Sequence, residues 1–305
     1  MQRLRIQHTT RYVYLRPVEF TRHRLVIRPR EGHDLRIESM QLRIEPAHAL
    51  TWARDVFGNS IALVDFGEPA TVLEIVNDVI VERFLPFPAR ILHTPVRVPY
   101  PVVYDPFEST MIGAYLERSF PEDVPVITTW LGENLRVDPT DAEGTVLSLC
   151  VLVNSKIKYL RRQEKGVQTP AQTVQLSSGS CRDLATLMMD AARALGLAAR
   201  FASGYIHGIA SLAGHASTHA WTEVYLPDLG WRGFDPTLGT TISLRHVVAG
   251  VSNHPRGVMP ITGGFIGKRV DFKELDVHVK TEELPDSPNV LPAAASQPPA
   301  GQASA

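Results

Sequence analysis

The chain has 305 residues, of which 44% are hydrophobic, and its formal net charge at pH 7 is −1. This size and hydrophobic content are sufficient for two hydrophobic cores, so we expect two folded domains. A nearly neutral chain offers no overall electrostatic attraction for nucleic acid or for a membrane surface, and we expect neither as a partner. The first 18 residues lack the apolar segment of a signal peptide, and no run of 18 or more apolar residues occurs. We therefore expect a cytoplasmic protein.

The N-terminal third of the chain alternates between apolar and polar side chains. The alternation is clear in residues 4–8, 40–44 and 73–75, and turn-forming pairs such as Gly58-Asn59 separate the alternating runs. Because successive side chains of a strand point to opposite faces, this pattern predicts strands with one buried face. We expect an antiparallel β-sandwich-like domain over residues 1–98.

A proline-rich passage, residues 86–106, follows this region. Proline cannot donate to a sheet ladder and stiffens the chain, which favours a connector, and we place the domain boundary near Pro99. The second domain then spans residues 99–284, and an alternating run at residues 275–279 predicts an edge strand near its end. Residues 285–305 are rich in Pro, Ala, Ser and Gln, which predicts a disordered tail.

The segment Gly179-Ser180-Cys181-Arg182-Asp183 contains a thiol at the predicted start of a helix. The helix is indicated by apolar residues at helical spacing, followed by a glycine that favours its end: Leu184, Leu187, Met188, Ala191, Leu195 and Gly196. We expect its apolar face to pack inward and Cys181 to lie at the exposed end. The free N–H groups and the positive dipole there favour a thiolate, and the Cys181 N–H can donate to an oxyanion. This pattern is typical of a thiol nucleophile.

Two predicted strands downstream supply a base and a carboxylate. His219 lies at the start of a strand over residues 218–226, and Asp235 lies on a strand over residues 231–237, with a turn at residues 227–230 between them. Pairing Leu226 directly with Trp231 sets Asp235 opposite Thr222, about 10 Å from His219 at the rise of a strand. Contact between Asp235 and His219 therefore requires a bulge or a shifted register.

The three motifs G-S-C-R-D, H-A-W-T-E-V-Y and G-W-R-G-F-D-P-T, in this order, resemble the transglutaminase-like superfamily. The resemblance covers roughly residues 146–237 and implies an α+β fold with a papain-like core. The β-rich segment before it resembles the N-terminal domain of bacterial transglutaminase-like cysteine peptidases. By this resemblance Cys181 is the nucleophile, His219 the general base and acid, and Asp235 the residue that orients His219.

The resemblance implies acyl transfer from amide bonds of a peptide or protein substrate through a thioester, with no cofactor. Water as acceptor gives a cysteine peptidase or amidase, whereas an amine gives a protein-glutamine transglutaminase. Hydrolysis is favoured because no amine-binding signature is visible in the sequence. A non-catalytic binding module is a further alternative. The second oxyanion donor is not identified by the motifs, although a side chain near Gln172 or Gln175 is a candidate. The oligomeric state is not predicted.

A metal centre is the main chemical alternative, because His207, His215 and His219 accompany Cys181 and Asp235 in the sequence. No H-E-x-x-H or C-x-x-C spacing supports it, and we expect no metal. His207 and His215 fall in residues 204–217, which are rich in small residues and predict a mobile rim over the cleft.

The remaining motif residues have structural interpretations. Cys150 shares an apolar helical stripe with residues 146, 149, 153 and 157, which predicts a buried structural thiol rather than a disulfide partner for Cys181. Arg182 and Asp183 are expected to be first-turn helix residues without a catalytic role.

Overall fold

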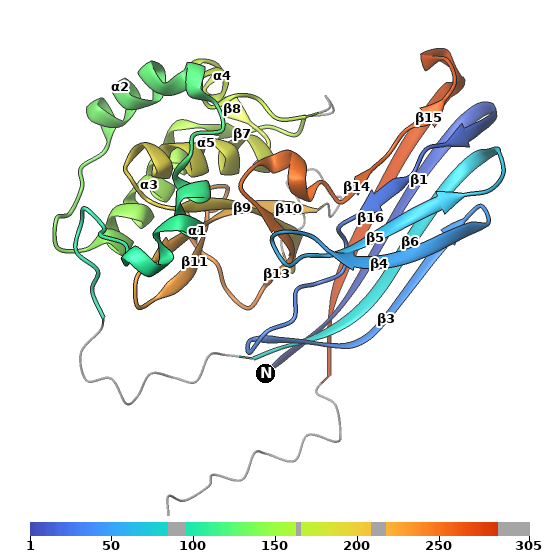
Figure 1. Ribbon diagram of the computed structural model, residues 1–305, viewed down its shortest axis with the longest axis horizontal. Helices are drawn as coiled ribbons and strands as arrows, with labels where there is room; N and C mark the ends of the chain where they lie inside the picture. The colour runs from blue at the N-terminus through green and yellow to red at the C-terminus, as the bar shows by residue number, and fades with distance from the viewer. Residues whose placement is uncertain (85–95, 163–165, 209–217, 286–305) are drawn as a thin grey trace, which may run out of the picture.

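The computed structural model describes residues 1–84, 96–162, 166–208 and 218–285 (Figure 1). Most of the predicted proline-rich connector, residues 209–217 of the predicted rim, and residues 286–305 of the predicted tail lie outside the described residues. No helix in the described part of the chain is long and apolar enough to cross a membrane.

The N-terminal region consists of two antiparallel sheets that share one core. The larger sheet contains β15 (Phe265–Ile266), β1 (Gln2–Phe20), β6 (Ala70–Arg83) and β3 (Leu35–Glu45), with β16 (Phe272–Leu284) also paired to β1. The smaller sheet has the order β14 (Ile261–Thr262), β2 (His23–Leu25), β5 (Ser60–Phe66) and β4 (His48–Arg54). Side chains from both sheets, such as Leu25, Val64 and Leu73, form a common buried cluster. The alternation predicted for residues 4–8, 40–44 and 73–75 is confirmed in β1, β3 and β6.

The C-terminal strand returns to the N-terminal sheet. β16 pairs antiparallel with residues 3–14 of β1, and β14 pairs with β2. The predicted edge strand at residues 275–279 is thus confirmed, but its partner is β1, which the sequence assigned to the other domain. Alternation specifies a strand with one buried face and not the strand beside it, because side-chain direction carries no information on the neighbour.

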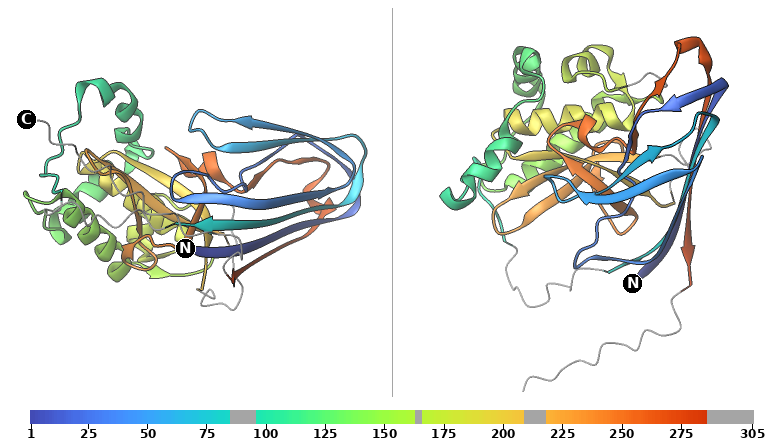
Figure 2. Two further views of the ribbon diagram at one scale, coloured as in Figure 1. Left: turned by 90° about the horizontal axis from the view of Figure 1, so that it is seen from below. Right: turned by 45° about the vertical axis from the view of Figure 1, so that its right-hand side comes forward.

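A second, mixed region lies beside these sheets (Figure 2). Its sheet has the order β12 (Thr240–Thr241), β11 (Gly230–Asp235), β10 (His219–Leu226), β9 (Ala199–Ile206) and β13 (His246–Ser252). Its helices are α1 (Pro106–Leu116), α2 (Val124–Asn134), α3 (Ala142–Lys156), α4 (Pro170–Leu176) and α5 (Cys181–Ala194), with short 3₁₀ turns at Pro121–Asp123 and Pro255–Val258. A third 3₁₀ turn, Arg269–Asp271, contacts β1 of the N-terminal region. Two short parallel strands, β7 (Lys158–Tyr159) and β8 (Ser178–Gly179), join the α3 and α5 ends.

Helix α5 forms the centre of this region. It begins at Cys181 as predicted, and Gly196 with φ 75° lies just beyond its C-terminal end. Its predicted apolar stripe is buried except for Leu195, which caps the helix and is partly buried, but nearly all its other residues are buried too. The polar ones have partners: the Arg193 guanidinium donates to the carbonyls of Glu117, Ala199 and Asn253. The helix is therefore enclosed on most sides, and not on one face as its apolar spacing suggests.

The two regions meet through β1 and β9. Leu4 and Ile6 of β1 share a buried cluster with Tyr205 of β9 and Val247 of β13. Within this contact His8 is 3% exposed, its Nδ1 lies 3.1 Å from the Tyr205 hydroxyl, and its Nε2 lies 3.1 Å from Thr10 Oγ1. These contacts fix the sheet of the mixed region, at the edge formed by β13, against the N-terminal sheet.

Candidate active site

Cys181 begins α5 directly after the β7–β8 ladder. Leu160 N donates to Gly179 O over 2.8 Å, which fixes the backbone two residues before the thiol. The first N–H groups of a helix have no acceptor within that helix, so the Cys181 N–H is available to an incoming carbonyl oxygen. Cys181 is only 8% exposed, and the prediction that it lies exposed is wrong. Tyr159 on the adjoining strand lies near the thiol, and burial followed by the Cys181 charge raises the pKa of Tyr159.

Asp183 organises the start of α5. Its fully buried carboxylate accepts from Ser180 N at 2.8 Å, from Ser180 Oγ at 2.7 Å and from Gln168 N at 2.7 Å, and it pairs with Arg162 at 2.8 Å. A Cβ at Gly179 would lie 2.7 Å from Asp183 Cβ, so a glycine is needed there. Asp183 is thus more than the first-turn residue that was predicted, because it ties the preceding segments to the thiol-bearing turn.

The β10–β11 hairpin has a register shifted by one residue from direct pairing of Leu226 with Trp231. Leu226 pairs with Gly230, because the loop contains three residues rather than four and Asp228 adopts a left-handed conformation with φ 64°. Continuing this register sets Asp235 opposite Trp221, two residues from His219 and on the same face. A shift of one residue moves a strand's side chains to the other face. The shift that the sequence required for contact between His219 and Asp235 is present, without a bulge.

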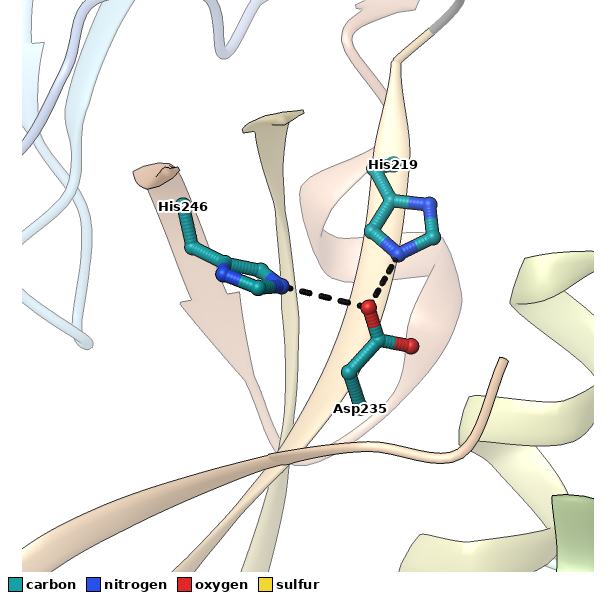
Figure 3. Close-up of side chains that lie close together, drawn as sticks. All are labelled: His219, Asp235 and His246. Carbon is teal, nitrogen blue, oxygen red and sulfur yellow. Dashed lines mark hydrogen bonds and ion pairs between the residues drawn. The ribbon is translucent and has the colours of Figure 1, made fainter. Parts of the chain in front are cut away.

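His219 Nε2 lies 2.7 Å from Asp235 Oδ2 (Figure 3). Burial lowers the pKa of His219, but the interactions with Asp235 and with Cys181 outweigh it and raise the pKa above its usual value. For Asp235, burial acts to raise the pKa, but the hydrogen bonds from His219 and His246 outweigh it and hold the pKa well below the usual range. The site therefore favours an imidazolium beside a carboxylate, with the Cys181 thiol next to the ring.

The Asp235 backbone is held by a turn and by α3. Asp235 Oδ1 accepts from Thr237 N at 2.9 Å, and the Asn154 amide donates to the Thr237 carbonyl at 2.8 Å. On the other side, Thr222 Oγ1 of β10 donates to the Ala185 carbonyl at 2.9 Å, which docks the hairpin on α5. These contacts bring the ends of α5, β10 and β11 together.

His246 belongs to this cluster and was not found from the sequence. It lies on β13, is 3% exposed, and its Nε2 is 3.2 Å from Asp235 Oδ2 (Figure 3). It stands outside the three motifs, in a strand whose apolar character predicts only burial. Nothing in its sequence neighbourhood indicates a polar role.

Cys150 is buried in α3 together with the predicted stripe residues, which confirms its structural interpretation. Burial, and then the nearby Asp235 charge, raise the pKa of Cys150 to about 12. Both cysteines are free thiols. Cys150 therefore offers a matched unreactive thiol in the same domain as Cys181.

The structure separates the histidines of the metal alternative. His207 turns to β16, where its Nδ1 is 3.3 Å from Thr281 Oγ1, and His215 lies outside the described residues. Among the described residues, three side chains have potential ligand atoms within 4.8 Å of one another: His219, Asp235 and His246. The His246 Nδ1 accepts from Ser243 N at 3.2 Å, so the ring hydrogen is on Nε2, which then donates to Asp235 and has no free lone pair for a metal.

Two other predicted features have different roles. Residues 204–206 of the predicted rim belong to β9, and a Cβ at Gly204 would lie 2.0 Å from the Val247 carbonyl oxygen, so this end is tightly packed strand. Gln172, a candidate oxyanion donor, instead accepts from Thr169 N at 3.0 Å in the cap of α4.

Comparison with known proteins finds relatives that are similar to this chain over most of its length. Residues 4–82 match the bacterial transglutaminase-like N-terminal region, and residues 130–236 match the transglutaminase-like superfamily. An uncharacterised protein of Mycobacterium tuberculosis is 29% identical over 277 residues, covering 86% of this chain and 87% of that protein. One from Mycobacterium leprae is 24% identical over 292 residues, covering 93% of this chain and all of the relative.

A solved structure shares the fold. The crystal structure of a candidate cysteine protease from Cytophaga hutchinsonii superposes with a TM-score of 0.70 at 16% identity, covering 94% of this chain and 92% of that one. The likeness extends over both the N-terminal sheets and the mixed region that carries Cys181.

Proposed function

Because the chain belongs to the transglutaminase-like superfamily, we propose that it is a thiol enzyme that transfers acyl groups from amide bonds of peptides or proteins. Cys181 is the nucleophile, His219 the general base and acid, and Asp235 the residue that orients His219. The observation that carries the proposal is the 2.7 Å contact of His219 Nε2 with Asp235 Oδ2, with the Cys181 thiol beside the same ring.

The proposed chemistry depends on which nitrogen of the His219 ring does not contact Asp235. Nε2 of His219 faces Asp235 (Figure 3). Nδ1 is therefore the atom that exchanges a proton with Cys181. The Cys181 proton passes to His219, which gives the imidazolium that the site favours. The thiolate sulfur then attacks the amide carbonyl carbon, and the Cys181 N–H donates to the oxyanion. When the C–N bond breaks, His219 returns the proton to the leaving amine and a thioester remains. Asp235 stabilises the imidazolium throughout.

Water is the proposed acceptor of the acyl group. His219 removes a proton from water, the hydroxide oxygen attacks the thioester carbonyl, and the Cys181 thiol is released with the acid product. A protein-glutamine transglutaminase, with an amine in place of water, is the alternative, and a binding module without turnover is the third. The cytoplasmic location expected from the sequence stays a prediction, and two free thiols suit a reducing compartment.

The proposal is tested by trapping the acyl enzyme on a defined thiol. The full chain is incubated with a peptide library, with and without a primary amine, and intact and digested protein is analysed by mass spectrometry. We expect peptide cleavage and an adduct on Cys181, both lost in Cys181→Ala and both retained in Cys150→Ala. Isopeptide products formed with the amine would favour the transglutaminase. Absence of any adduct, with iodoacetamide reacting equally with Cys181 and a free thiol, would favour the binding module.

A further inference from the structure

We propose that His246 is a positioning residue for this site: it donates a hydrogen bond to Asp235 and so holds the carboxylate toward His219. The inference rests on the proposed function and adds a fourth side chain to it. The carrying observation is that two imidazoles share one carboxylate oxygen, with His219 Nε2 at 2.7 Å and His246 Nε2 at 3.2 Å from Asp235 Oδ2.

His246 reaches the site across β9, which lies between β10 and β13. Gly204 of β9 pairs with His219 on one side and with Val248 on the other. In paired antiparallel strands, directly opposite residues share a face, so Ile206, the partner of His246, lies on this face of β9 together with Gly204 and Ala202. Gly204 has no side chain, which leaves room over β9 for the His246 ring. A strand away from Asp235 thus contributes a donor to it.

The tautomer of His246 is set by its own loop. Ser243 N donates to His246 Nδ1 at 3.2 Å, and His246 N donates back to the Ser243 carbonyl at 3.0 Å. Nδ1 is therefore an acceptor, and the ring hydrogen lies on Nε2, directed at Asp235. The Trp221 ring stands edge-on to His246, with centroids 5.4 Å apart and an interplanar angle of 79°, which restricts rotation of the imidazole.

Asp235 needs this second donor because it is fully buried. Its Oδ1 accepts from Thr237 N, whereas its Oδ2 accepts only from the two rings among the described residues. A buried carboxylate keeps its charge only when hydrogen bonds replace water. If the His246 donor is lost, the carboxylate is less stabilised as an anion. Its orientation toward His219 is also less fixed, so the imidazolium loses part of its positioned partner, although His246 never touches the reacting atoms.

The other ionisable groups near the cluster do not replace this donor. Cys150 of α3 is influenced by the Asp235 charge, Cys181 of α5 adjoins His219, and Tyr159 of β7 adjoins Cys181. The neighbouring Arg245 turns away, and its Nε donates to the His207 carbonyl at 2.8 Å. Among the described residues, His246 is thus the one ionisable side chain besides His219 that donates to Asp235.

Two substitutions of His246 distinguish loss of its hydrogen bond to Asp235 from loss of the volume of its ring. His246→Gln keeps an N–H near the position of Nε2, whereas His246→Asn is too short to reach Asp235 but keeps an acceptor for Ser243 N. His207→Asn is the control, because His207 contacts Thr281 of β16 and not the site. The readout is the rate of Cys181 alkylation by iodoacetamide against pH, which needs no known substrate. Thermal unfolding of each variant shows whether it is folded.

We expect half-maximal alkylation of the Asn variant to require a pH about one unit higher than in the wild type, and its alkylation to be about tenfold slower at pH values below both midpoints. The Gln and His207 variants should follow the wild type, and with a peptide substrate the Asn variant should lose kcat with little change in KM. Equal profiles for Asn and Gln, or a wild-type profile for Asn, would overturn the role of His246. Wild-type Cys181 that reacts no faster than a free thiol would instead overturn the proposed function.

Discussion

The molecule buries one histidine at the contact between its two regions and another in its site, and their surroundings give them opposite properties. His8 is 3% exposed, and the side chain of His219 is 11% exposed. Burial lowers the pKa of His8 to about 4, because its partners are the hydroxyls of Thr10 and Tyr205. Burial also acts to lower the pKa of His219, but Asp235 and Cys181 raise it overall.

The difference shows that the charge of the partners, and not the depth of burial, distinguishes His219 from His8. A neutral ring at β1 can accept and donate hydrogen bonds between two sheets without needing a counter-ion. The His219 ring, which lies beside both Asp235 and Cys181, is stabilised as the cation, which is the form that follows proton transfer from the thiol.

Replacing each histidine should separate catalysis from structure. We expect His219→Ala to lower peptide turnover by about 10⁴-fold, since the proton from Cys181 then has no acceptor. His8→Gln should change turnover at pH 7 by less than about threefold, because His8 lies at the β1–β9 contact. Both are measured as kcat/KM on a cleaved peptide. Equal losses in the two variants would mean that His219 acts through stability alone.

Removing the charge of Asp235 should make His219 resemble His8. Asp235→Asn keeps the shape of the side chain, and we expect it to lower turnover by about 10³- to 10⁴-fold while the melting temperature changes little. The imidazole resonances of His219, followed by NMR against pH, should titrate at a lower pH than in the wild type. Unchanged titration in the Asn variant would show that Asp235 does not set the charge of His219.

Much of the candidate site can be predicted from local sequence. Cys181, His219 and Asp235 each sit in a short motif, and the start of α5 and its Gly196 end follow from spacing and a left-handed glycine. Local signals suffice there because each depends on neighbours within a few residues. The pairing of β10 with β11 depends instead on whether the loop has three or four residues, and the unusual backbone of Asp228 decides it.

The features that could not be predicted from the sequence all depend on contacts between residues far apart in the chain. β16 pairs with β1 from the opposite end of the chain, and alternation in either strand does not name the other. His246 acts across β9, so its role exists only once the sheet order is known. Cys181 is buried because it belongs to a large apolar cluster to which residues far apart in the sequence contribute. Spacing within a helix carries no record of such contacts.

The smallest effect concerns His8 and acid stability. The folded pKa of about 4 lies below the unfolded value of 6.5, so between these pH values the unfolded chain binds a proton that the folded chain does not. The His8 contribution is complete above pH 6.5 and is lost as pH falls toward 4, by up to about 3 kcal/mol. His8→Gln should lack this part of the pH dependence in urea unfolding. Its stability relative to the wild type should therefore rise as pH falls from 7 to 4, and a constant difference would show that His8 is not held neutral. His8 and His219 would then not differ in charge in the way that their different partners require.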